Sequence, residues 1–270
     1  MKIFGIMLVK NEIDIIGYVL KEAERWCDKI FILDNGSTDG TWELIQSMKN
    51  DIITPWKQYF GEYHDGLRAE VYNEFKDTST PGDWWCYKLD ADEVYAEDPR
   101  EFLSNTSKKY HWVGKRDINY RITKEDLEEY NFTGKFEEDK KYLKYFPVPC
   151  WSEGRFFRFR KNLSWEPEFG SHYPKHIGVM SPEYITVYHY SQRSPQQIQK
   201  RAELRKDTLV YKKGLEFAHE NKDIKSRSFY EFDDGDIEKL KTYPVTSGNF
   251  KQNFFKNLIK RFLICLNLYN

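Results

Sequence analysis

The sequence predicts an α/β protein with a mostly parallel sheet flanked by helices. Short apolar runs, typical of strands buried on both faces, alternate with segments of helical periodicity, and this alternation indicates a parallel sheet. Polar clusters at 10–12, 34–39 and 90–93 each follow one of the apolar runs. Because ligands bind beyond the carboxyl ends of the strands in such sheets, we expect the three clusters to meet along one edge.

The first half of the chain supplies the alternating elements. The apolar run from Ile3 to Val9 is followed by a capping Asn11 and then by apolar residues at helical spacing. A second run ends in the turn-rich sequence Asp34 to Gly40. The predicted strands are 3–9, 29–33, 52–54 and 84–89, and helices are predicted behind residue 11, from about 41 to 48, and around 67–75.

The second half is less regular. Strands are predicted near 108–121, 155–160 and 183–190, with a highly charged excursion over 125–144. A polar helix over 195–213 begins with a proline.

The end of the chain predicts an amphipathic helix with lysines beside its apolar face, which carries Phe250, Phe254, Leu258 and Phe262. Amphipathic helices usually cover a core, so we favour docking on the domain or on a second subunit. The alternative is peripheral contact of residues 250–268 with a membrane surface.

The composition is that of a globular chain of 270 residues, 40% hydrophobic and 31% charged. Lys and Arg number 42 and Asp and Glu 43, so no net field favours nucleic acid as a partner. Aromatic residues reach 17%, enough to fill a core or to line a surface that stacks on sugar rings.

Features that decide cellular location point to a cytoplasmic protein. Four cysteines (Cys27, Cys86, Cys150 and Cys265) form no CxxC pair, so we expect reduced thiols. The apolar run 3–9 is too short for a signal peptide, and no stretch of about 20 apolar residues could span a bilayer.

Two carboxylates, Asp90 and Asp92, stand at the mouth of a buried strand, separated by Ala91. Like charges repel and burial of charge is costly, so we expect a bound divalent cation that offsets both costs. Hard oxygen ligands of this kind suit Mg²⁺ or Mn²⁺. The loop from Asp34 to Asp39 offers acceptors for a nucleobase and ribose hydroxyls, or caps the helix at Thr41, and both roles are compatible.

Three motifs carry a family resemblance: Leu8-Val9-Lys10-Asn11-Glu12, Leu33 to Thr41, and Leu89-Asp90-Ala91-Asp92-Glu93. In order and spacing they resemble the family 2 glycosyltransferases with the GT-A fold, over roughly residues 1–95. Gly66 to Asn73 also resembles that family's basic-Ala-x-x-x-Asn helix. The resemblance implies a nucleotide-sugar site built from Val9, Asn11, Glu12, Asp34, Asn35, Ser37, Asp39, Arg68, Asp90 and Ala91.

The resemblance also implies a bound Mn²⁺ or Mg²⁺. Asp92 would be its direct ligand, and His189, which follows an apolar strand, would complete the coordination. The alternative for His189 is a core histidine bonded to backbone, and for Arg68 an exposed helix arginine.

The acceptor side resembles one branch of the family through Arg155, Trp165 and His172. That branch has a His-Glu pair where this chain has His172-Tyr173, so the catalytic base must come from another carboxylate. The nearby candidates are Glu153, Glu166 and Glu168, and Glu168 is preferred.

The expected activity is metal-dependent transfer of a sugar from a nucleotide-diphosphate donor, with UDP expected, to a hydroxyl of a glycan or glycolipid, with inversion. The alternatives are a non-catalytic nucleotide- or carbohydrate-binding protein, and a nucleotidyltransferase, against which the absence of an N-terminal Gly-rich phosphate loop counts. We expect a GT-A-like domain over 1–195, with a nucleotide-sugar half (1–95) and an irregular acceptor half (96–195), and a helical extension over 196–270.

Overall fold

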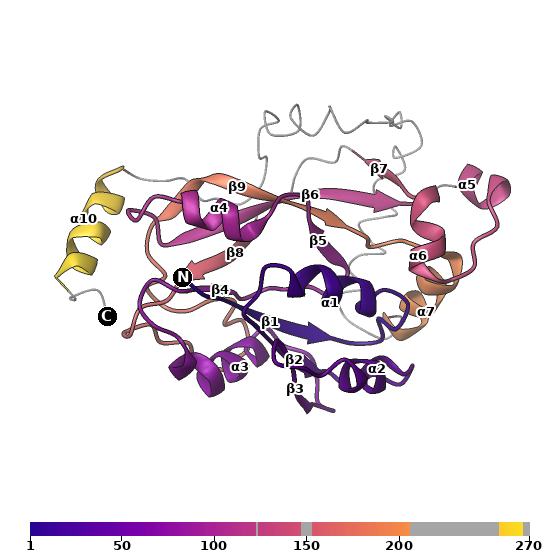
Figure 1. Ribbon diagram of the computed structural model, residues 1–270, viewed down its shortest axis with the longest axis horizontal. Helices are drawn as coiled ribbons and strands as arrows, with labels where there is room; N and C mark the ends of the chain where they lie inside the picture. The colour runs from indigo at the N-terminus through magenta and orange to yellow at the C-terminus, as the bar shows by residue number, and fades with distance from the viewer. Residues whose placement is uncertain (123, 147–152, 206–253, 267–270) are drawn as a thin grey trace. The chain divides into compact units, whose positions relative to one another are not determined.

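The computed structural model describes residues 1–122, 124–146, 153–205 and 254–266 (Figure 1). The chain forms two compact units. The first comprises Met1–Asp117, Pro149–Tyr188 and Val245–Asn270, and the second Ile118–Val148 and His189–Pro244. The predicted boundary between 195 and 196 stays a prediction, and residues 206–253 of the predicted extension lie outside the described residues.

The first unit contains the predicted parallel sheet, with strands in the order β3-β2-β1-β4. Its alternating strand–helix order is confirmed. The elements are β1 (Ile3–Val9), α1 (Ile16–Glu24), β2 (Lys29–Asp34), α2 (Thr41–Ser47), β3 (Ile53–Gln58), α3 (Leu67–Phe75), a 3-10 turn (Lys76–Thr78) and β4 (Trp84–Cys86).

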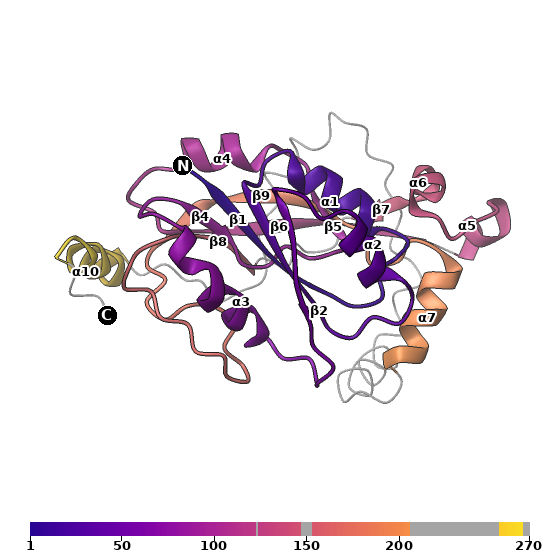
Figure 2. The same cartoon turned by 60° about the horizontal axis from the view of Figure 1, so that its bottom comes forward.

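All seven residues of β1 are buried, as the apolar run predicted, because helices cover both faces of the strand. Phe4, Ile6 and Leu8 face one core cluster, which they share with Leu67 and Val71 of α3. Helix α1 lies on the opposite face, as Figures 1 and 2 show.

Two predicted strands end elsewhere. Strand β3 continues past residue 54 to Gln58, because it lies at the edge of the sheet, where Pro55 removes no required ladder hydrogen bond. Strand β4 is shorter than predicted. The chain beyond it still follows β1, because Leu89 N donates to Ile6 O over 3.0 Å.

Beyond β4 the sheet becomes antiparallel. Strand β8 (Glu153–Arg158) pairs with β4 and with β6 (Trp112–Arg121), and the order continues through β9 (Met180–His189) to β5 (Glu93–Tyr95). Strands β6, β8 and β9 confirm the three strands predicted in the second half. Helix α4 (Pro99–Asn105) is capped by Asp98, which accepts from Arg100 N over 2.7 Å.

The second unit holds α5 (Lys124–Glu129), α6 (Phe136–Asp139), a 3-10 turn (Lys140–Tyr142), β7 (Lys144–Phe146) and α7 (Pro195–Arg205). The predicted charged excursion thus contains two short helices. Buried Asp139 orders it by accepting from Thr133 N and Gly134 N, over 2.9 and 2.8 Å. The described part of the predicted helix over 195–213 is α7.

The unusual aromatic content fills the core of the first unit. The rings of Trp84, Trp85, Tyr87 and Phe157 are buried, and Tyr87 packs against Phe157 with centroids 5.8 Å apart. No helix in the described ranges is long and apolar enough to cross a membrane.

Two glycines test this packing. A Cβ at Gly154 would lie 2.1 Å from Tyr87 Oη and 2.6 Å from Trp112 Cζ3, whereas one at Gly17 in α1 would meet only Leu44, at 3.8 Å. Gly154→Ala should lower the free energy of unfolding by about 1–3 kcal/mol through overpacking. Gly17→Ala should raise it by about 0.5–1 kcal/mol, because alanine favours the helix. Chemical denaturation of both variants measures this, and equal effects would contradict the packing at β8.

Candidate functional site

Two of the three polar clusters are bound together at the carboxyl edge of β1 and β2. Val9 pairs with Asp34 in the sheet, and Asn35 N donates to Val9 O over 2.8 Å. Asn11, in the left-handed region at φ 56°, donates its N–H to Ser37 Oγ over 2.9 Å. The Oδ1 of Asn11 accepts from Thr38 N over 2.8 Å. Asn11 and Ser37 therefore shape the site by holding its two loops together.

Asp34 and Asn35 place buried acceptors at this edge. The Oδ1 of Asp34 accepts from Ser37 N and Gln58 Nε2, over 2.8 and 3.2 Å. The Asp34 Oδ2 and the Asn35 Oδ1 are buried with no hydrogen-bond partner. Buried polar atoms are normally paired, so each of these two acceptors has the capacity for a further hydrogen bond.

Asp39 and Glu12 start helices. The Oδ1 of Asp39 accepts from Thr41 N over 3.1 Å at the beginning of α2, although the N-cap residue of this helix is Gly40, which has no side chain to cap it. The carbonyl of Glu12 accepts from Ile16 N over 2.9 Å at the beginning of α1. Their predicted contacts with a donor stay predictions.

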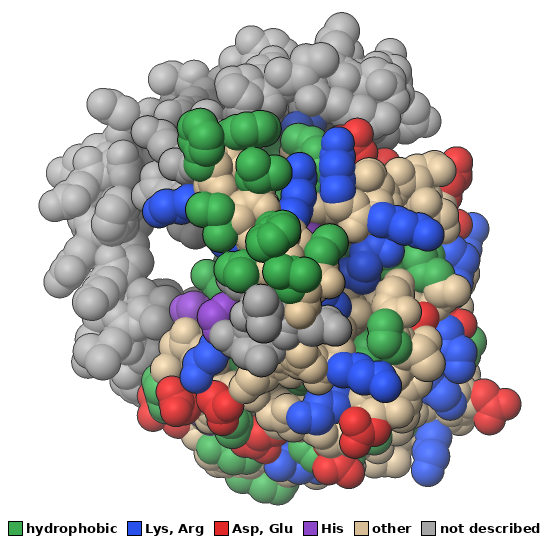
Figure 3. Space-filling view, turned by 90° about the vertical axis from the view of Figure 1, so that its left-hand side faces the viewer, with side chains coloured by type: hydrophobic (Ala, Val, Ile, Leu, Met, Phe, Trp, Pro, Cys, Tyr) green, Lys and Arg blue, Asp and Glu red, His purple; other side chains and the backbone are tan. Residues whose placement is uncertain are grey.

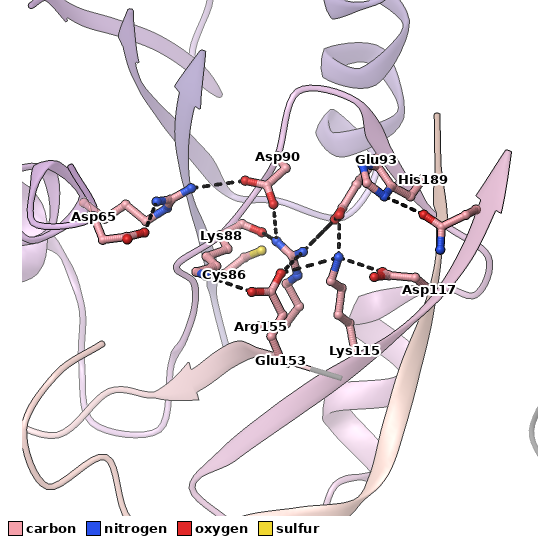
Figure 4. Close-up of polar contacts among 12 residues, drawn as sticks. Asp65, Cys86, Lys88, Asp90, Glu93, Lys115, Asp117, Glu153, Arg155 and His189 are labelled. Atoms are coloured by element: carbon pink, nitrogen blue, oxygen red, sulfur yellow. Dashed lines mark hydrogen bonds and ion pairs between the residues drawn. The ribbon is translucent and has the colours of Figure 1, made fainter. Parts of the chain in front are cut away.

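The third cluster is anchored by Arg155, which is fully buried on β8 (Figure 4). Its Nη1 lies 2.9 Å from Asp90 Oδ2, and its Nη2 lies 2.8 Å from Glu93 Oε2 and 2.8 Å from Glu153 Oε1. Arg155 thus holds the strand ends from within, instead of facing an acceptor as the resemblance implied. This corrects its predicted place, which sequence spacing alone could not show.

A second buried cation, Lys115 on β6, joins the same carboxylates. Its Nζ pairs with Glu93, lies 2.6 Å from Asp117 Oδ1 and 3.4 Å from Glu153 Oε1. Lys88 Nζ adds a contact to Glu153 Oε2 at 2.8 Å. The sequence analysis missed Lys115 and Asp117. The sequence feature that could have revealed them is a pair of opposite charges two positions apart, and so on the same face of the strand, with apolar residues on either side.

Arg68 connects Asp90 to a neighbouring loop. Its Nη2 donates to Asp90 Oδ1 over 3.2 Å, and its Nη1 donates to Tyr63 Oη and Asp65 Oδ1, over 2.8 and 3.1 Å. The side chain is 6% exposed, so Arg68 is not the exposed helix arginine of the alternative interpretation. Its Nη groups are held by protein atoms and orient Asp90. Contact with a diphosphate stays a prediction.

The arginines keep Asp90 charged. Burial alone would raise the pKa of Asp90, but Arg155 and Arg68 outweigh it and hold that pKa well below its usual range. For Glu153, burial is likewise outweighed by Arg155, Lys115 and Lys88, which lower the pKa to about 2. Burial raises the pKa of Glu93 despite Arg155 and Lys115.

The cluster has one carboxylate more than it has cations. The cations are Arg68, Lys88, Lys115 and Arg155, and the carboxylates are Asp65, Asp90, Glu93, Asp117 and Glu153. Asp92, 8% exposed, and buried Ala91 follow Asp90 directly.

The two predicted metal ligands belong to different units, Asp92 to the first and His189 to the second. Among the described residues, no three His, Cys, Asp or Glu side chains are grouped to hold a metal ion. His189 belongs to the second unit, where its Nδ1 lies 2.9 Å from Asn119 Oδ1. A Mg²⁺ that keeps waters and binds substrate phosphates needs only one or two protein carboxylates, so Asp92 fits such a role.

The predicted acceptor residues divide into buried and exposed ones. Trp165 lies in the core, 1% exposed, where its Nε1 donates to Ser171 O over 3.0 Å. Its ring therefore packs the protein and presents no face to an acceptor, which corrects its predicted place. His172 is half exposed, and its Nδ1 lies 2.9 Å from Asp65 Oδ2.

Glu168 is exposed on the loop that meets the start of α3. A Cβ at Gly66 would lie 2.5 Å from Glu168 O, so only glycine permits this approach. Next to it, the exposed ring of Phe169 stacks on His64 with centroids 4.9 Å apart. The sequence analysis missed this aromatic pair, because its members are 105 positions apart.

Comparison with known proteins decides the family. The model of glycosyl transferase family 2 matches residues 6–164, more than half of the chain. The chain belongs to glycosyl transferase family 2. The predicted family is thereby confirmed, and the match extends past the third motif through β8.

Three similar proteins illustrate the relation. The lipopolysaccharide core biosynthesis glycosyltransferase LpsC of Rhizobium meliloti (strain 1021) is 34% identical over 99 residues, which are 34% of this chain and 32% of LpsC. The chain therefore matches about a third of that relative's length. S. aureus TarS 1–349 is similar in structure, with 13% identity, 76% of this chain and 64% of TarS covered, and a TM-score of 0.35. The UDP complex of TarS 1–349 covers 45% of this chain and 36% of TarS, with 15% identity and a TM-score of 0.31.

Two arginines of β8 test the buried network. Arg155 has three carboxylate partners, whereas Arg158 donates to the carbonyls of Tyr110 and Thr106. Arg155→Met should lower the free energy of unfolding by about 3–5 kcal/mol at pH 7, because it leaves buried carboxylates without their counter-charge. Arg158→Met should cost only about 1–2 kcal/mol.

The pH dependence of unfolding separates the two variants further. The pKa of Glu153 is lower in the folded protein than in the unfolded chain. Its ionised form therefore stabilises the fold at any pH above the unfolded pKa, and this contribution is lost as the pH falls through about 2. Arg155→Met should shrink that acid-labile contribution and leave a flatter profile between neutral and acid pH, whereas Arg158→Met should keep the wild-type slope. Parallel profiles would contradict the assigned network.

Proposed function

We propose that this chain transfers a sugar from a nucleoside diphosphate, with UDP as the expected nucleotide, to a hydroxyl of a glycan or glycolipid. Membership of glycosyl transferase family 2 supports sugar transfer. The observation that carries the donor site is the pair of unpartnered buried acceptors on Asp34 and Asn35. They stand at the same sheet edge as the chain leading to Asp90.

The acceptors suit a nucleobase. The imide N–H of uracil could donate to Asp34 Oδ2. An unpaired buried acceptor costs free energy, so the site would strongly favour a ligand that donates a hydrogen bond to it over one that does not. Ser37 N holds the other oxygen of Asp34, so the carboxylate is already oriented before the ligand binds.

Asp90 and Asp92 have different roles in this proposal. Asp90 is fixed by Arg155 and Arg68 and would meet the ribose, while Asp92 would hold Mg²⁺ or Mn²⁺ together with the donor's diphosphate. Such an ion, when bound, would stabilise the charge that grows on the leaving diphosphate. His189 as a further ligand is part of the proposal and rests on the family resemblance alone.

The transfer needs a carboxylate to accept the proton of the acceptor hydroxyl. The hydroxyl oxygen bonds to the anomeric carbon while the bond from that carbon to the diphosphate oxygen breaks, with inversion. Glu153 is a poor candidate, because a pKa of about 2 leaves it a weak base. The exposed Glu168, beside the His64–Phe169 stack and the half-exposed His172, is the better one.

The name of the Rhizobium meliloti relative refers to lipopolysaccharide core biosynthesis. A glycolipid acceptor for this chain is consistent with that name, and the exposed Phe169 ring would offer a face for an acceptor sugar to stack on.

Nucleotide binding tests the donor site. Isothermal titration with UDP, GDP, dTDP and CMP should show binding of UDP that strengthens with Mn²⁺. Asp92→Ala should abolish the Mn²⁺ effect and weaken binding at least roughly tenfold, since it removes a metal ligand. Asp34→Asn should weaken UDP binding with and without Mn²⁺, because an amide N–H would face the base donor.

The control for the titration is Asp51→Ala, at an exposed carboxylate before β3. It should bind like the wild type. If no nucleotide binds the folded wild-type protein, the donor-site assignment fails.

The base assignment has its own test. Glu168→Gln should lower kcat by about 10²–10⁴-fold without changing UDP affinity, as expected for a lost general base. Nucleotide release from sugar donors, with water or added glycans as acceptor, measures this. Glu166→Gln, at an exposed residue whose Oε1 accepts from Ser164 Oγ over 2.8 Å, should retain activity. Wild-type rates in Glu168→Gln would exclude Glu168 as the base.

A further inference from the structure

The last described helix, α10 (Phe254–Cys265), carries a continuous apolar surface that the protein leaves exposed. At about 100° per residue its large apolar side chains fall within an arc of about 140°. These side chains, with their exposed fractions, are Phe254 71%, Phe255 74%, Leu258 53%, Ile259 58% and Phe262 64%. For the described residues this face does not dock on the domain, whereas the expected docking on a second subunit stays a prediction.

Helix α10 contacts its own unit through a different side. The guanidinium of Arg261 lies over the ring of Tyr110, 5.6 Å from its centroid. Leu263 and Ile264, which lie outside this arc, are half-buried. The helix therefore has a protein-facing side as well as the exposed arc. An exposed apolar patch of this size in a globular protein marks an interaction surface.

The sequence that leads into and through α10 is strongly basic. No Asp or Glu follows Glu238, whereas Lys239, Lys241, Lys251, Lys256, Lys260 and Arg261 do. Figure 3 shows the hydrophobic side chains gathered on this face with Lys and Arg side chains beside them.

The neighbouring residues of the first unit extend the positive charge. Lys108 and Lys109 are exposed next to Tyr110. The pKa of His111 is lowered to about 4 by burial and by the nearby arginines Arg160, Arg158 and Arg261. Lys108, Lys109 and these arginines thus gather positive charge at this end of the unit.

We propose that α10 lies on an anionic membrane surface, with its apolar arc in the boundary between headgroups and acyl chains and its cations at the lipid phosphates. Apolar and aromatic residues on one face with Lys and Arg beside them are the features of an interfacial helix. At twelve residues α10 is about 18 Å long, too short to span the hydrocarbon core.

Charge selects this occupant over a second copy of the chain. An isologous dimer through α10 would bring two basic surfaces together, and like charges across an interface are unfavourable. Anionic lipids balance the same cations, each Lys or Arg near the surface adding to the attraction. The inference goes beyond the proposed transfer reaction and does not depend on it.

Co-sedimentation of the full chain with vesicles tests the proposal. The protein should bind vesicles of equimolar phosphatidylcholine and phosphatidylglycerol, bind phosphatidylcholine alone much more weakly, and lose affinity as salt is raised. The double variant Phe255→Gln/Phe262→Gln should bind the anionic vesicles at least roughly tenfold more weakly. Lys256→Glu/Lys260→Glu should lose affinity by a similar factor and lose most of the salt dependence.

Leu127→Gln, at another exposed apolar residue in the second unit, is the matched control and should bind vesicles like the wild type. Circular dichroism and thermal unfolding of each variant should match those of the wild type, which shows that the fold is unaffected. Failure of wild-type binding to anionic vesicles, or binding that neither α10 variant weakens, would overturn the proposal. So would a concentration-dependent dimer, seen by sedimentation velocity, that Phe255→Gln/Phe262→Gln dissociates.

Discussion

The buried guanidinium of Arg155 is the interaction on which the arrangement of the candidate site depends. It reaches from an antiparallel strand to carboxylates that follow the parallel strands, including Asp90 and Glu93. A buried charge is tolerated only when it is paired and hydrogen-bonded, so the positions of these carboxylates and of Arg155 are mutually determined. The parallel and antiparallel parts of the sheet are therefore joined by charge as well as by backbone hydrogen bonds.

In this arrangement Asp90 and Asp92, which are separated in the sequence only by Ala91, have different proposed roles. Asp90 is held ionised by Arg155 and Arg68, whereas Asp92 is the residue proposed for the metal. Arg68 also pairs with Asp65. Asp65 in turn contacts His172, which lies on the loop that bears Glu168. Polar contacts thus connect Asp90, through Arg68 and Asp65, to His172.

Membership of glycosyl transferase family 2 and the exposed face of α10 are separate properties. The family fold explains the sheet, its carboxyl edge and the loops of the first two motifs. Helix α10 lies outside the matched residues 6–164, and its apolar arc serves no core. A membrane-bound location would suit a chain whose acceptor is a glycolipid, because enzyme and acceptor would then meet on a surface.

By itself, the sequence determined the alternation of strands and helices, the order of the three motifs and the family, because these depend on periodicity and on residues close together in the chain. Only the tertiary structure decided which charged residues are buried together. Lys115, Glu93 and Arg155 are far apart in sequence, and Trp165 is a core residue because of rings contributed by other elements. A pattern of neighbouring residues does not identify partners that are far apart in the sequence. These distant partners decide whether a charged side chain can be buried.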